Sequence, residues 1–304
     1  MSLQNKIIKL LLLVLNYGLN YPLIFRLIGK INRKIRWIKN IFIAYPANQS
    51  YARSYAYQRF YAQMKWTPWI AALLKYNESL GIMMVISGTE DDFHDPKNRP
   101  HLKMMVKRVE TVAQLLGVSQ VTFAGILPGI LYKRQIRKSL VEADITINAI
   151  LESERQIQKQ MGYSLDVPII IIGSKGFIGS QLAVHLKNRP IFQIDSPSVN
   201  LANTDDWPDF LKNKIAIVIN ISRKCVLRYY IHLFWKELII INDVYPEPSN
   251  DEIQQISKIG CSLFHITGIK GCAFPPFPGA YKNGLPCCST YIEQSPHMII
   301  TKLC

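Results

Sequence analysis

Residues 168–186 constrain this chain more than any other stretch, and they read PIIIIGSKGFIGSQLAVHL. Four consecutive isoleucines predict a strand that is buried on both faces of a parallel sheet, because β-branched residues without alternating polar ones leave no face for water. The helix-period positions Ile178, Leu182 and Leu186 begin among the glycines that follow. The stretch therefore predicts a strand, a tight glycine turn and a helix, the arrangement of a nucleotide-phosphate site.

The glycine spacing supports this prediction, although it differs by one position from the commonest dinucleotide fingerprint. Gly173 would let the chain turn sharply off the strand, Gly176 would let backbone approach a pyrophosphate, and Gly179 would let the helix pack closely on the sheet. The phosphates would then bind at the helix N-terminus. We expect the whole turn to contact the cofactor, namely Gly173, Ser174, Lys175, Gly176, Phe177, Ile178 and Gly179.

An acidic residue ends the next predicted strand, residues 190–195, and lies 22 positions after Gly173. Asp195 at that place can bind both ribose hydroxyls of an adenosine and would repel a 2′-phosphate. The expected cofactor is therefore NAD or NADP, with NAD favoured. The alternative is that Asp195 caps the following turn, which Pro197 and Ser198 support.

The length of 304 residues suits two domains, and 49% apolar residues are enough for two hydrophobic cores. In the first half, predicted strands alternate with predicted helices, which indicates a small parallel sheet. The strands are residues 40–45, 82–87 and 120–124, and the helices lie near residues 50–65 and 100–116. Beyond a long predicted helix, the later strands are residues 168–172, 190–195, 214–222 and 238–244.

We therefore expect an α/β protein in which a small parallel α/β domain precedes a Rossmann-type doubly wound parallel sheet, with an N-terminal helical extension. The expected parts are a basic apolar N-terminal segment (1–39), a small α/β substrate domain (40–138), a linking helix (139–166) and an NAD(P)-binding domain with a C-terminal cysteine loop (167–304).

Polar residues stand at or beyond the ends of the later strands. Asn220 and Ser222 close one strand, and Asp243 closes the next. Ligands of open α/β sheets bind at the carboxyl ends of the strands. We expect Asn220 and Ser222 to contact the cofactor; the alternative is that such residues only cap strand ends.

Residues 1–39 are apolar and basic. Residues 1–40 carry eight cations and no acid, and so hold eight of the fifteen excess positive charges of the chain. Ile31, Ile35 and Ile38 would share one face of a helix whose other faces are cationic, which suits the surface of an anionic membrane. The alternative is a helical hairpin that packs on the body of the protein or on a second subunit of a homo-oligomer.

Two other classes of partner are not expected. The aromatic residues between Tyr51 and Trp69 have few basic residues among them, so their helical spacing indicates packing rather than binding of nucleic acid. None of the six cysteines forms a CxxC, so no structural metal is expected. Free thiols favour a cytoplasmic protein, peripheral at the cytoplasmic membrane if residues 1–39 bind lipid.

Two adjacent cysteines, Cys287 and Cys288, follow a stiff proline-rich loop near the end of the sequence. A helix that began at Ser289 would lower the pKa of a nearby thiol and favour the nucleophilic thiolate. The alternative is two small buried residues.

Together these features resemble the long-chain acyl-[acyl-carrier-protein] reductases and their relatives among the shikimate- and amino-acid-dehydrogenase-like proteins, over roughly residues 40–290. The motifs that carry the resemblance are Gly125-Ile126-Leu127-Pro128-Gly129, Gly173-Ser174-Lys175-Gly176-Phe177-Ile178-Gly179 and Pro286-Cys287-Cys288. The chain departs from those families in Asp195, because the reductases use NADPH, and in lacking an evident lysine-aspartate pair of the shikimate-dehydrogenase kind.

The resemblance implies a thioester mechanism. Cys288, or secondly Cys287, would take the acyl group from an acyl carrier protein, and hydride would release an aldehyde. The substrate would lie against Gly125, Ile126, Leu127 and Pro128, whose backbone NH groups could hold an oxyanion. We thus expect an NAD(P)-dependent oxidoreductase that reduces a fatty acyl thioester. The alternatives are a dehydrogenase of a small hydroxy or amino acid without covalent catalysis, and a non-catalytic nucleotide-sensing protein.

Overall fold

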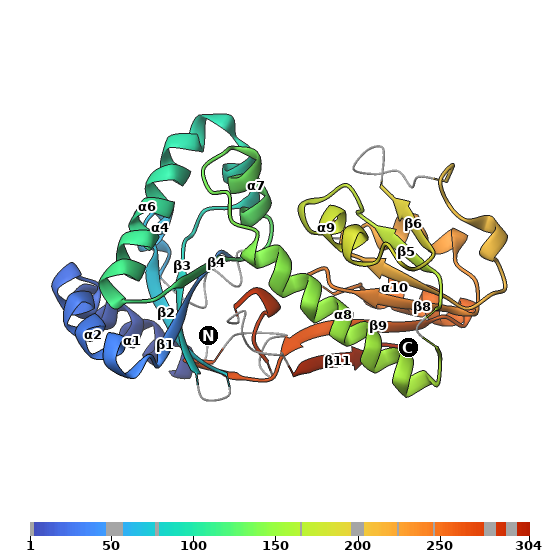
Figure 1. Cartoon of the computed structure of the whole chain (residues 1–304). Coiled ribbons are helices and arrows are strands. Elements are labelled where there is room, and N and C mark those ends of the chain that lie inside the picture. The colour runs from blue at the N-terminus through green and yellow to red at the C-terminus, as the bar shows by residue number, and fades with distance from the viewer. Residues whose placement is uncertain are drawn as a thin grey trace. The chain divides into compact units, whose positions relative to one another are not determined.

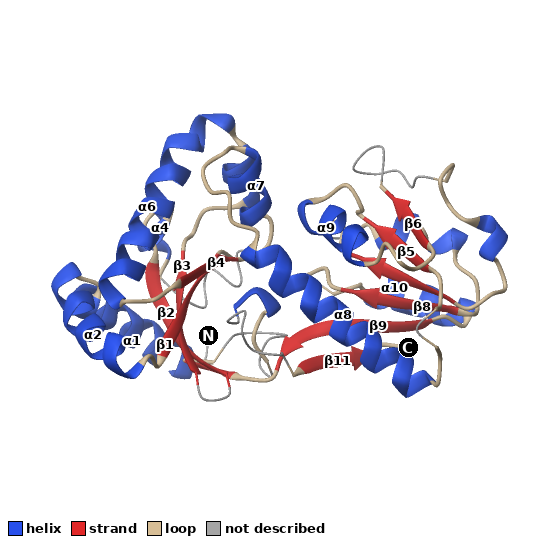
Figure 2. Ribbon diagram, in the orientation of Figure 1, coloured by secondary structure: helices blue, strands red, loops and turns tan. Residues whose placement is uncertain are grey.

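A computed structural model of the chain describes residues 3–46, 57–76, 79–164, 166–195, 204–223, 225–245, 247–276, 284–289 and 297–304. The chain divides into two compact units, which Figures 1 and 2 show with their helices and strands. The first unit comprises Met1–Ile145 and Ile269–Ser295, and the second comprises Thr146–Gly268 and Pro296–Cys304. The sequence analysis placed the cysteine loop in the second domain, whereas its described residues group with the first unit.

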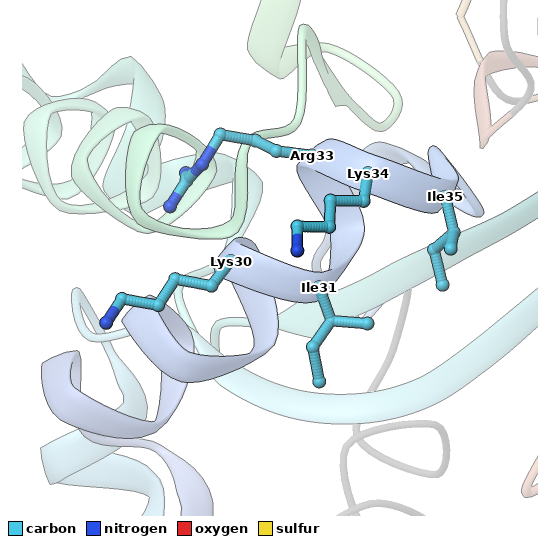
Figure 3. Close-up of a pocket in the computed structure, with 5 residues that line it drawn as sticks. All are labelled: Lys30, Ile31, Arg33, Lys34 and Ile35. Carbon is cyan, nitrogen blue, oxygen red and sulfur yellow. The ribbon is translucent and has the colours of Figure 1, made fainter.

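Two helices, α1 (Leu3–Leu19) and α2 (Pro22–Ile35), open the first unit, as the N-terminal sequence predicts. α2 begins with a proline, whose fixed φ suits the first helical position. Side chains in its last two turns surround a surface hollow (Figure 3). No described helix is by itself long and apolar enough to cross a membrane; Lys6–Leu19 and Pro22–Ile35 pass that test only as a pair, and they bend by 89° where they meet.

The first sheet is mixed. β1 runs parallel to β3 and β4, as the sequence predicts, whereas β2 is antiparallel to both β3 and β10, which the sequence analysis did not foresee. Only two residues separate β2 from β3, and so short a connection joins antiparallel neighbours. The strands lie in the order β10 (Cys272–Phe274), β2 (Trp69–Tyr76), β3 (Ser79–Val85), β1 (Ile38–Ala44) and β4 (Gln120–Phe123).

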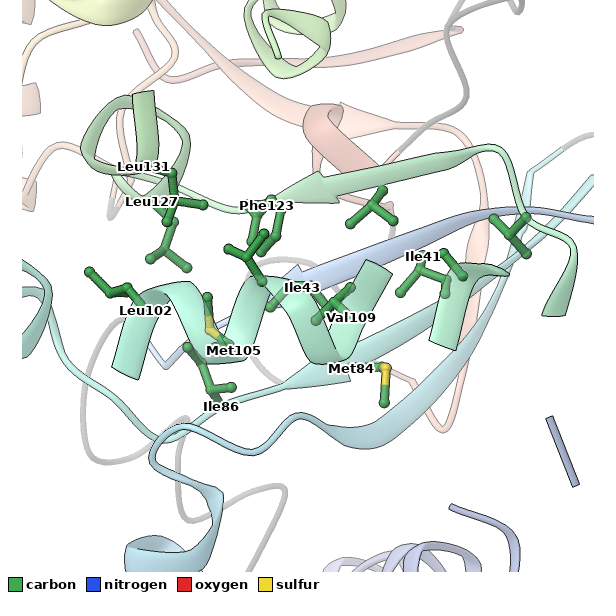
Figure 4. Close-up of a cluster of buried hydrophobic side chains, with 14 of the residues drawn as sticks. Ile41, Ile43, Met84, Ile86, Leu102, Met105, Val109, Phe123, Leu127 and Leu131 are labelled. Atoms are coloured by element: carbon green, nitrogen blue, oxygen red, sulfur yellow. The ribbon is translucent and has the colours of Figure 1, made fainter. Parts of the chain in front are cut away.

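One helix, α6 (Arg99–Leu116), covers a face of this sheet, and Figure 4 shows the core between them. Its residues Leu102, Met105 and Val109 are fully buried against Ile41 and Ile43 of β1. Each such side chain stabilises the fold by about 1.5–3 kcal/mol through burial. The helix confirms the prediction over residues 100–116.

Shorter helices complete the first unit. They are η1 (Gln58–Phe60), α4 (Tyr61–Met64), α5 (Glu90–His94), η2 (Pro96–Asn98), α7 (Leu127–Lys133) and η7 (Cys287–Ser289). The helix expected near residues 50–65 is represented by η1 and α4, and residues 50–56 lie outside the described part. The helix expected from Ser289 falls on residues 290–296, which lie outside the described part. The last described element is a strand, β11 (Met298–Lys302).

The long helix α8 (Val141–Met161) confirms the prediction over residues 139–161. Two partly buried ion pairs hold this helix, one in its first turn and one in its second half. Arg137 Nη1 donates to Glu142 Oε1 over 2.6 Å, and Arg189 Nη1 donates to Glu154 Oε1 over 2.8 Å. Burial raises the pKa of Glu142, and the charge of Arg137 opposes that shift.

The second unit contains a Rossmann-type sheet in the order β11-β9-β8-β7-β5-β6. The pairs from β6 to β9 are all parallel, as the isoleucine-rich sequences predict. The other strands are β5 (Ile169–Ile172), β6 (Ile191–Ile194), β7 (Ala216–Asn220), β8 (Leu238–Asn242) and β9 (Ser262–Ile269). The helices are α9 (Phe177–His185), η3 (Asp209–Leu211), η4 (Leu227–Tyr229), η5 (Ile231–Leu233) and α10 (Asn250–Ile259).

All four isoleucines of β5 are completely buried, which confirms that water reaches neither face of this strand. On one face, Ile170 and Ile172 pack in a cluster that includes Trp207, Tyr230 and Trp235. A core of this size fixes the carboxyl ends of the strands, where the polar residues of the second unit lie.

Candidate functional site

The glycine turn lies where the sequence predicts, between the end of β5 and the start of α9. Gly173 has a φ of 95°, which residues with a Cβ rarely adopt. A Cβ on Gly173 would lie 2.7 Å from the Cα of Ser222, and one on Gly179 would lie 2.1 Å from the carbonyl oxygen of Gly173. These two glycines are therefore required by close packing of the turn, the helix and the neighbouring strand.

Gly176 has a different environment. It is exposed, and a Cβ there would contact only the carbonyl oxygen of Gly173, at 3.1 Å. Gly176 is also the N-cap of α9, and no side chain caps that helix end. The first amides of a helix lack intrahelical acceptors, and the helix dipole favours an anion beside them. The turn thus offers room and donors for a phosphate.

The rest of the turn is tied to the end of β6. The amides of Gly173 and Ser174 both donate to the carbonyl oxygen of Ile194, over 2.9 and 3.2 Å, and the Ser174 hydroxyl donates to the same oxygen. Asp195 Oδ2 accepts from the amide of Lys175 over 3.2 Å. The acid is therefore held beside the glycine turn. Its alternative role as a cap of the next turn falls on residues 196–203, outside the described part.

The remaining turn residues differ in exposure. Ser174 is buried, Lys175 is exposed, and Phe177 and Ile178 are half-buried. Ser174 is thus occupied by the protein itself, while the Lys175 side chain is exposed to solvent.

The turn also lies at a topological switch point. From β5 the chain enters β6 on one side of the sheet and later returns to β7 on the other. Ligands of open α/β sheets bind beyond the carboxyl ends at such points. Ser222 follows β7 directly beside Gly173, so the structure brings these two predicted cofactor residues together.

A buried polar row crosses the carboxyl edge of the sheet. Asn220, Asn242 and His265 are partners in register on β7, β8 and β9. Asn220 Nδ2 donates to Asn242 Oδ1 over 2.7 Å, and the Ser222 hydroxyl donates to Asn220 Oδ1 over 2.5 Å. Asn242 Nδ2 lies 3.0 Å from His265 Nδ1. The row therefore links the glycine turn to a histidine three strands away.

His265 ends this row with an unused polar atom. The side chain is 4% exposed, and its Nε2 has no hydrogen-bond partner among the described residues. Its Nδ1 lies within 3.0 Å of both the Nδ2 and the backbone oxygen of Asn242, so it can accept from the first or donate to the second. Burial lowers the pKa of His265 and favours the neutral ring. The Nε2 can thus serve either as donor or as acceptor to a ligand.

Asp243 follows Asn242 at the same edge. Its amide donates to the carbonyl oxygen of Asn220 over 3.1 Å, and its side chain is half-buried. Loss of hydration raises the pKa of this carboxyl to about 7. A proton can therefore be taken up or released here near neutral pH.

Sequence analysis identified part of this row. It selected Asn220 and Ser222 and noted Asp243, but it missed Asn242 and His265. His265 lies inside the sequence Leu263-Phe264-His265-Ile266, and only the strand register shows that it continues the line of Asn220 and Asn242. The available signal was that Asn220 and Asn242 each close an otherwise apolar strand.

The Gly125 turn in the first unit uses two of its amides within the protein. The amide of Ile126 donates to the Tyr45 hydroxyl over 3.1 Å, and the amide of Leu127 donates to the carbonyl oxygen of Ala124 over 3.2 Å. Leu127 and Pro128 are buried in α7. These hydrogen bonds make the two amides poor donors for an oxyanion, and a substrate site at this turn stays a prediction.

Tyr45 occupies this edge of the first sheet. Its hydroxyl donates to Glu90 Oε1 over 3.2 Å, and a Cβ on Gly125 would lie 2.3 Å from that hydroxyl. Burial raises the pKa of Tyr45, the hydrogen bond from the Ile126 amide opposes that shift, and the charge of Glu90 adds to it.

The two predicted nucleophiles lie in η7, which packs against β1 and β4. Cys287 and Cys288 are half-buried. Asn40 Nδ2 donates to the carbonyl oxygen of Ser289 over 2.8 Å and so fixes the end of this turn to β1. Among the described residues, no group of three or more histidine, cysteine, aspartate or glutamate side chains could hold a metal ion.

No family model matches the sequence, and no curated protein sequence matches it. Among solved structures, the chain is similar to a shikimate dehydrogenase in complex with NADP+, with 12% identity and a TM-score of 0.40 over 75% of this chain and 84% of that one. It is also similar to L-tryptophan dehydrogenase from Nostoc punctiforme, with 12% identity and a TM-score of 0.34 over 74% of this chain and 68% of that one.

A third similar structure is quinate dehydrogenase from Corynebacterium glutamicum in complex with NAD, with 9% identity and a TM-score of 0.37 over 74% of this chain and 86% of that one. Likenesses at these TM-scores do not indicate the substrate or cofactor of this chain.

Proposed function

We propose that the second unit binds NAD or NADP and that the protein is an NAD(P)-dependent oxidoreductase of a small hydroxy or amino acid. The observation that carries this proposal is the glycine turn. Gly173 and Gly179 pack too closely for any side chain, whereas Gly176 leaves the uncapped start of α9 open to an anion. Such a turn at the switch point of a parallel sheet is suited to a pyrophosphate.

Residues beside the turn suit the rest of a dinucleotide. Asp195 has one carboxylate oxygen engaged by the Lys175 amide and can use the other for ribose hydroxyls, which favours NAD. Ser222 and Asn220 lie next to Gly173 and begin the polar row. When bound, the nicotinamide exchanges a hydride with the substrate. The neutral His265 and the Asp243 carboxyl are the groups at this edge that can hold the accompanying proton.

The first unit favours a substrate that needs no thioester chemistry. The amides of Ile126 and Leu127 are already hydrogen-bonded, so this turn has no ready oxyanion site from them. A hydroxy acid or amino acid can be oxidised by hydride transfer without a covalent intermediate, and it requires no oxyanion hole.

Binding is tested by replacing Gly176 with alanine. The added methyl group requires the Gly173 carbonyl to shift by only a few tenths of an ångström, but it blocks the approach of a phosphate. We expect titration calorimetry to show NADH binding at least about tenfold weaker than in the wild type, with little change in melting temperature. Gly18→Ala is the control, because a Cβ there contacts nothing. Equal binding by Gly176→Ala, or no binding of NADH or NADPH by the wild type, would contradict the proposal.

Thioester reduction is the second candidate, because the half-buried Cys288 lies in η7, which packs against β4, the strand that leads into the Gly125 turn. In that reaction an acyl carrier protein would deliver the acyl group to Cys288. Intact-protein mass spectrometry after exposure to an acyl thioester without cofactor separates the two candidates. Acylation that is lost in Cys288→Ser would favour the thioester reaction, whereas NAD-dependent oxidation of a hydroxy or amino acid that survives Cys288→Ser would favour the first.

A further inference from the structure

The exposed face of α1 and α2 is the most apolar surface of the described chain. Thirteen of the nineteen large apolar side chains that are exposed in the described residues lie between Ile7 and Trp37. They include Val14 and Leu23, each 64% exposed, Ile31 at 62% and Trp37 at 60%. Exposed apolar residues normally occur singly, and a concentration of this kind marks an interaction surface.

The opposite face of the same helices is fixed to the first unit. Asn16 Nδ2 donates to the carbonyl oxygen of Ile70 over 2.8 Å, and the amide of Ile70 donates to Asn16 Oδ1 over 2.7 Å. Asn16 thus pairs with β2 as a neighbouring strand would. The two helices therefore have one face committed to the protein and one face free of it.

α2 is attached to the rest of the first unit as firmly as α1 is. A Cβ on Gly29 would lie 1.9 Å from the carbonyl oxygen of Leu115, so the helix contacts the end of α6 backbone to backbone. Asn32 Nδ2 donates to the carbonyl oxygens of Leu116 and Ile38. Helices that are held along their length in this way lie flat on the unit and do not have the freedom of a separate transmembrane hairpin.

The free face is also strongly cationic. The exposed cations are Lys6, Arg26, Lys30, Arg33, Lys34 and Arg36, and residues 1–40 contain no acid. Lys30, Arg33 and Lys34 line a surface hollow of about 530 Å³ together with Ile31 and Ile35 (Figure 3). Arg33 also reaches the end of α6, where its Nη1 donates to the carbonyl oxygen of Leu115 over 3.4 Å and its stem packs against Gly117. Cations and apolar side chains thus alternate on one surface.

We propose that this surface, the exposed face of α1 and α2 with Trp37, docks the protein on an anionic lipid bilayer. The apolar side chains would enter the headgroup region, the lysines and arginines would bind lipid phosphates, and Trp37 would lie at the interface. A second copy of the chain fits less well, because a symmetric contact would place the same unbalanced cations against each other.

Sedimentation with lipid vesicles tests the proposal on the full chain. We expect binding to vesicles that contain phosphatidylglycerol, much weaker binding to pure phosphatidylcholine, and release as salt is raised. The double variant Lys30→Glu with Lys34→Glu should lower the affinity for anionic vesicles at least about tenfold. Ile31→Ser with Trp37→Ser should lower it by a similar factor.

The matched control reverses two lysines with the same helical spacing elsewhere on the first unit. Lys103 and Lys107 are exposed on α6, and the double variant Lys103→Glu with Lys107→Glu should bind vesicles as the wild type does. Circular dichroism would show that all variants are folded. The proposal would be overturned if both charge reversals lost vesicle binding equally, or if the wild type did not bind vesicles. It would also be overturned if the wild type were a dimer that the Ile31 and Trp37 changes dissociate.

Discussion

The carboxyl edges of the two sheets differ in how they are completed. In the first unit, Tyr45 fills the space beside Gly125, donates to Glu90 and accepts from the amide of Ile126. In the second unit, the corresponding turn has an exposed glycine, Gly176, at the start of α9, and no side chain caps that helix. The protein's own side chains therefore close the first edge, whereas no side chain covers the helix start at the second edge.

This difference shows that a glycine turn after a strand is not sufficient for a ligand site. Gly125 also has a positive φ, of 56°, and it also precedes a helix. The side chain that faces the turn decides its role, because the Tyr45 hydroxyl accepts the hydrogen bond of the Ile126 amide that a ligand would need. Four substitutions test this difference between the two edges, from the largest expected effect to the smallest.

The largest effect is expected from Gly179→Ala. Its Cβ would lie 2.1 Å from the Gly173 carbonyl oxygen and 2.8 Å from the Cα of Ser174, so turn and helix must separate. We expect NADH binding to be lost and stability to fall by about 3 kcal/mol. Gly125→Ala is the matched change at the first edge and should destabilise while leaving NADH affinity unchanged. Calorimetry and urea unfolding measure both, and loss of NADH binding in Gly125→Ala would remove the distinction.

The second effect concerns Asp243 and pH. Its pKa is about 7 in the folded protein, above the ordinary value of 3.8, so between about pH 4 and pH 7 the folded state binds more protons than the unfolded state. Its contribution to stability is therefore present below about pH 4 and is lost as pH rises to 7. The free energy of unfolding of Asp243→Asn should therefore rise by about 2 kcal/mol relative to that of the wild type between about pH 4 and pH 7. This is less than the whole pKa shift would give, because the carboxyl is only half-buried.

Urea unfolding of both proteins at several pH values measures this difference. Glu90→Gln serves as the comparison at the first edge, because it also exchanges a carboxylate for an amide, at a side chain that accepts from the Tyr45 hydroxyl. A constant difference between Asp243→Asn and the wild type across pH would contradict the assigned pKa.

More of the second edge than of the first could be predicted from the sequence, and the reason is physical. The glycine turn, Asp195 and Asn220 could be found from local patterns, because each follows a run of apolar residues that predicts a strand. His265 depends on the register between β8 and β9, which one-dimensional periodicity does not encode. Tyr45 was read only as the end of a strand, because its contact with Ile126 joins residues 81 positions apart.

The mixed first sheet also escaped prediction for a specific reason. β2 is apolar throughout residues 69–74, so no alternation of polar and apolar residues marks it as a strand, and its register shifts between Ile70 and Ala72. The placement of Cys287 and Cys288 likewise depends on Asn40, which binds the backbone of Ser289 across 249 positions of sequence. Local patterns predict elements well, but such contacts decide which unit a segment joins.

The third prediction is Tyr45→Phe at the first edge. The change leaves the Ile126 amide without its acceptor and removes the donor to Glu90, so stability should fall by about 1.5 kcal/mol. NADH affinity should remain within about twofold of the wild type, because the second edge is unchanged. Urea unfolding and calorimetry measure the two quantities. A large drop in NADH affinity with unchanged stability would instead make Tyr45 part of the ligand site.

The smallest effect is expected from Asp195→Asn, which tests the cofactor choice at the second edge. The amide oxygen can still accept from Lys175, so the turn keeps its contact, but the charge that would repel a 2′-phosphate is gone. We expect the preference for NADH over NADPH to narrow by about fivefold, with both dissociation constants measured by calorimetry. Asp166→Asn is the control for removing one negative charge elsewhere in the second unit. An unchanged preference would mean that Asp195 serves the turn alone and does not contact the ribose.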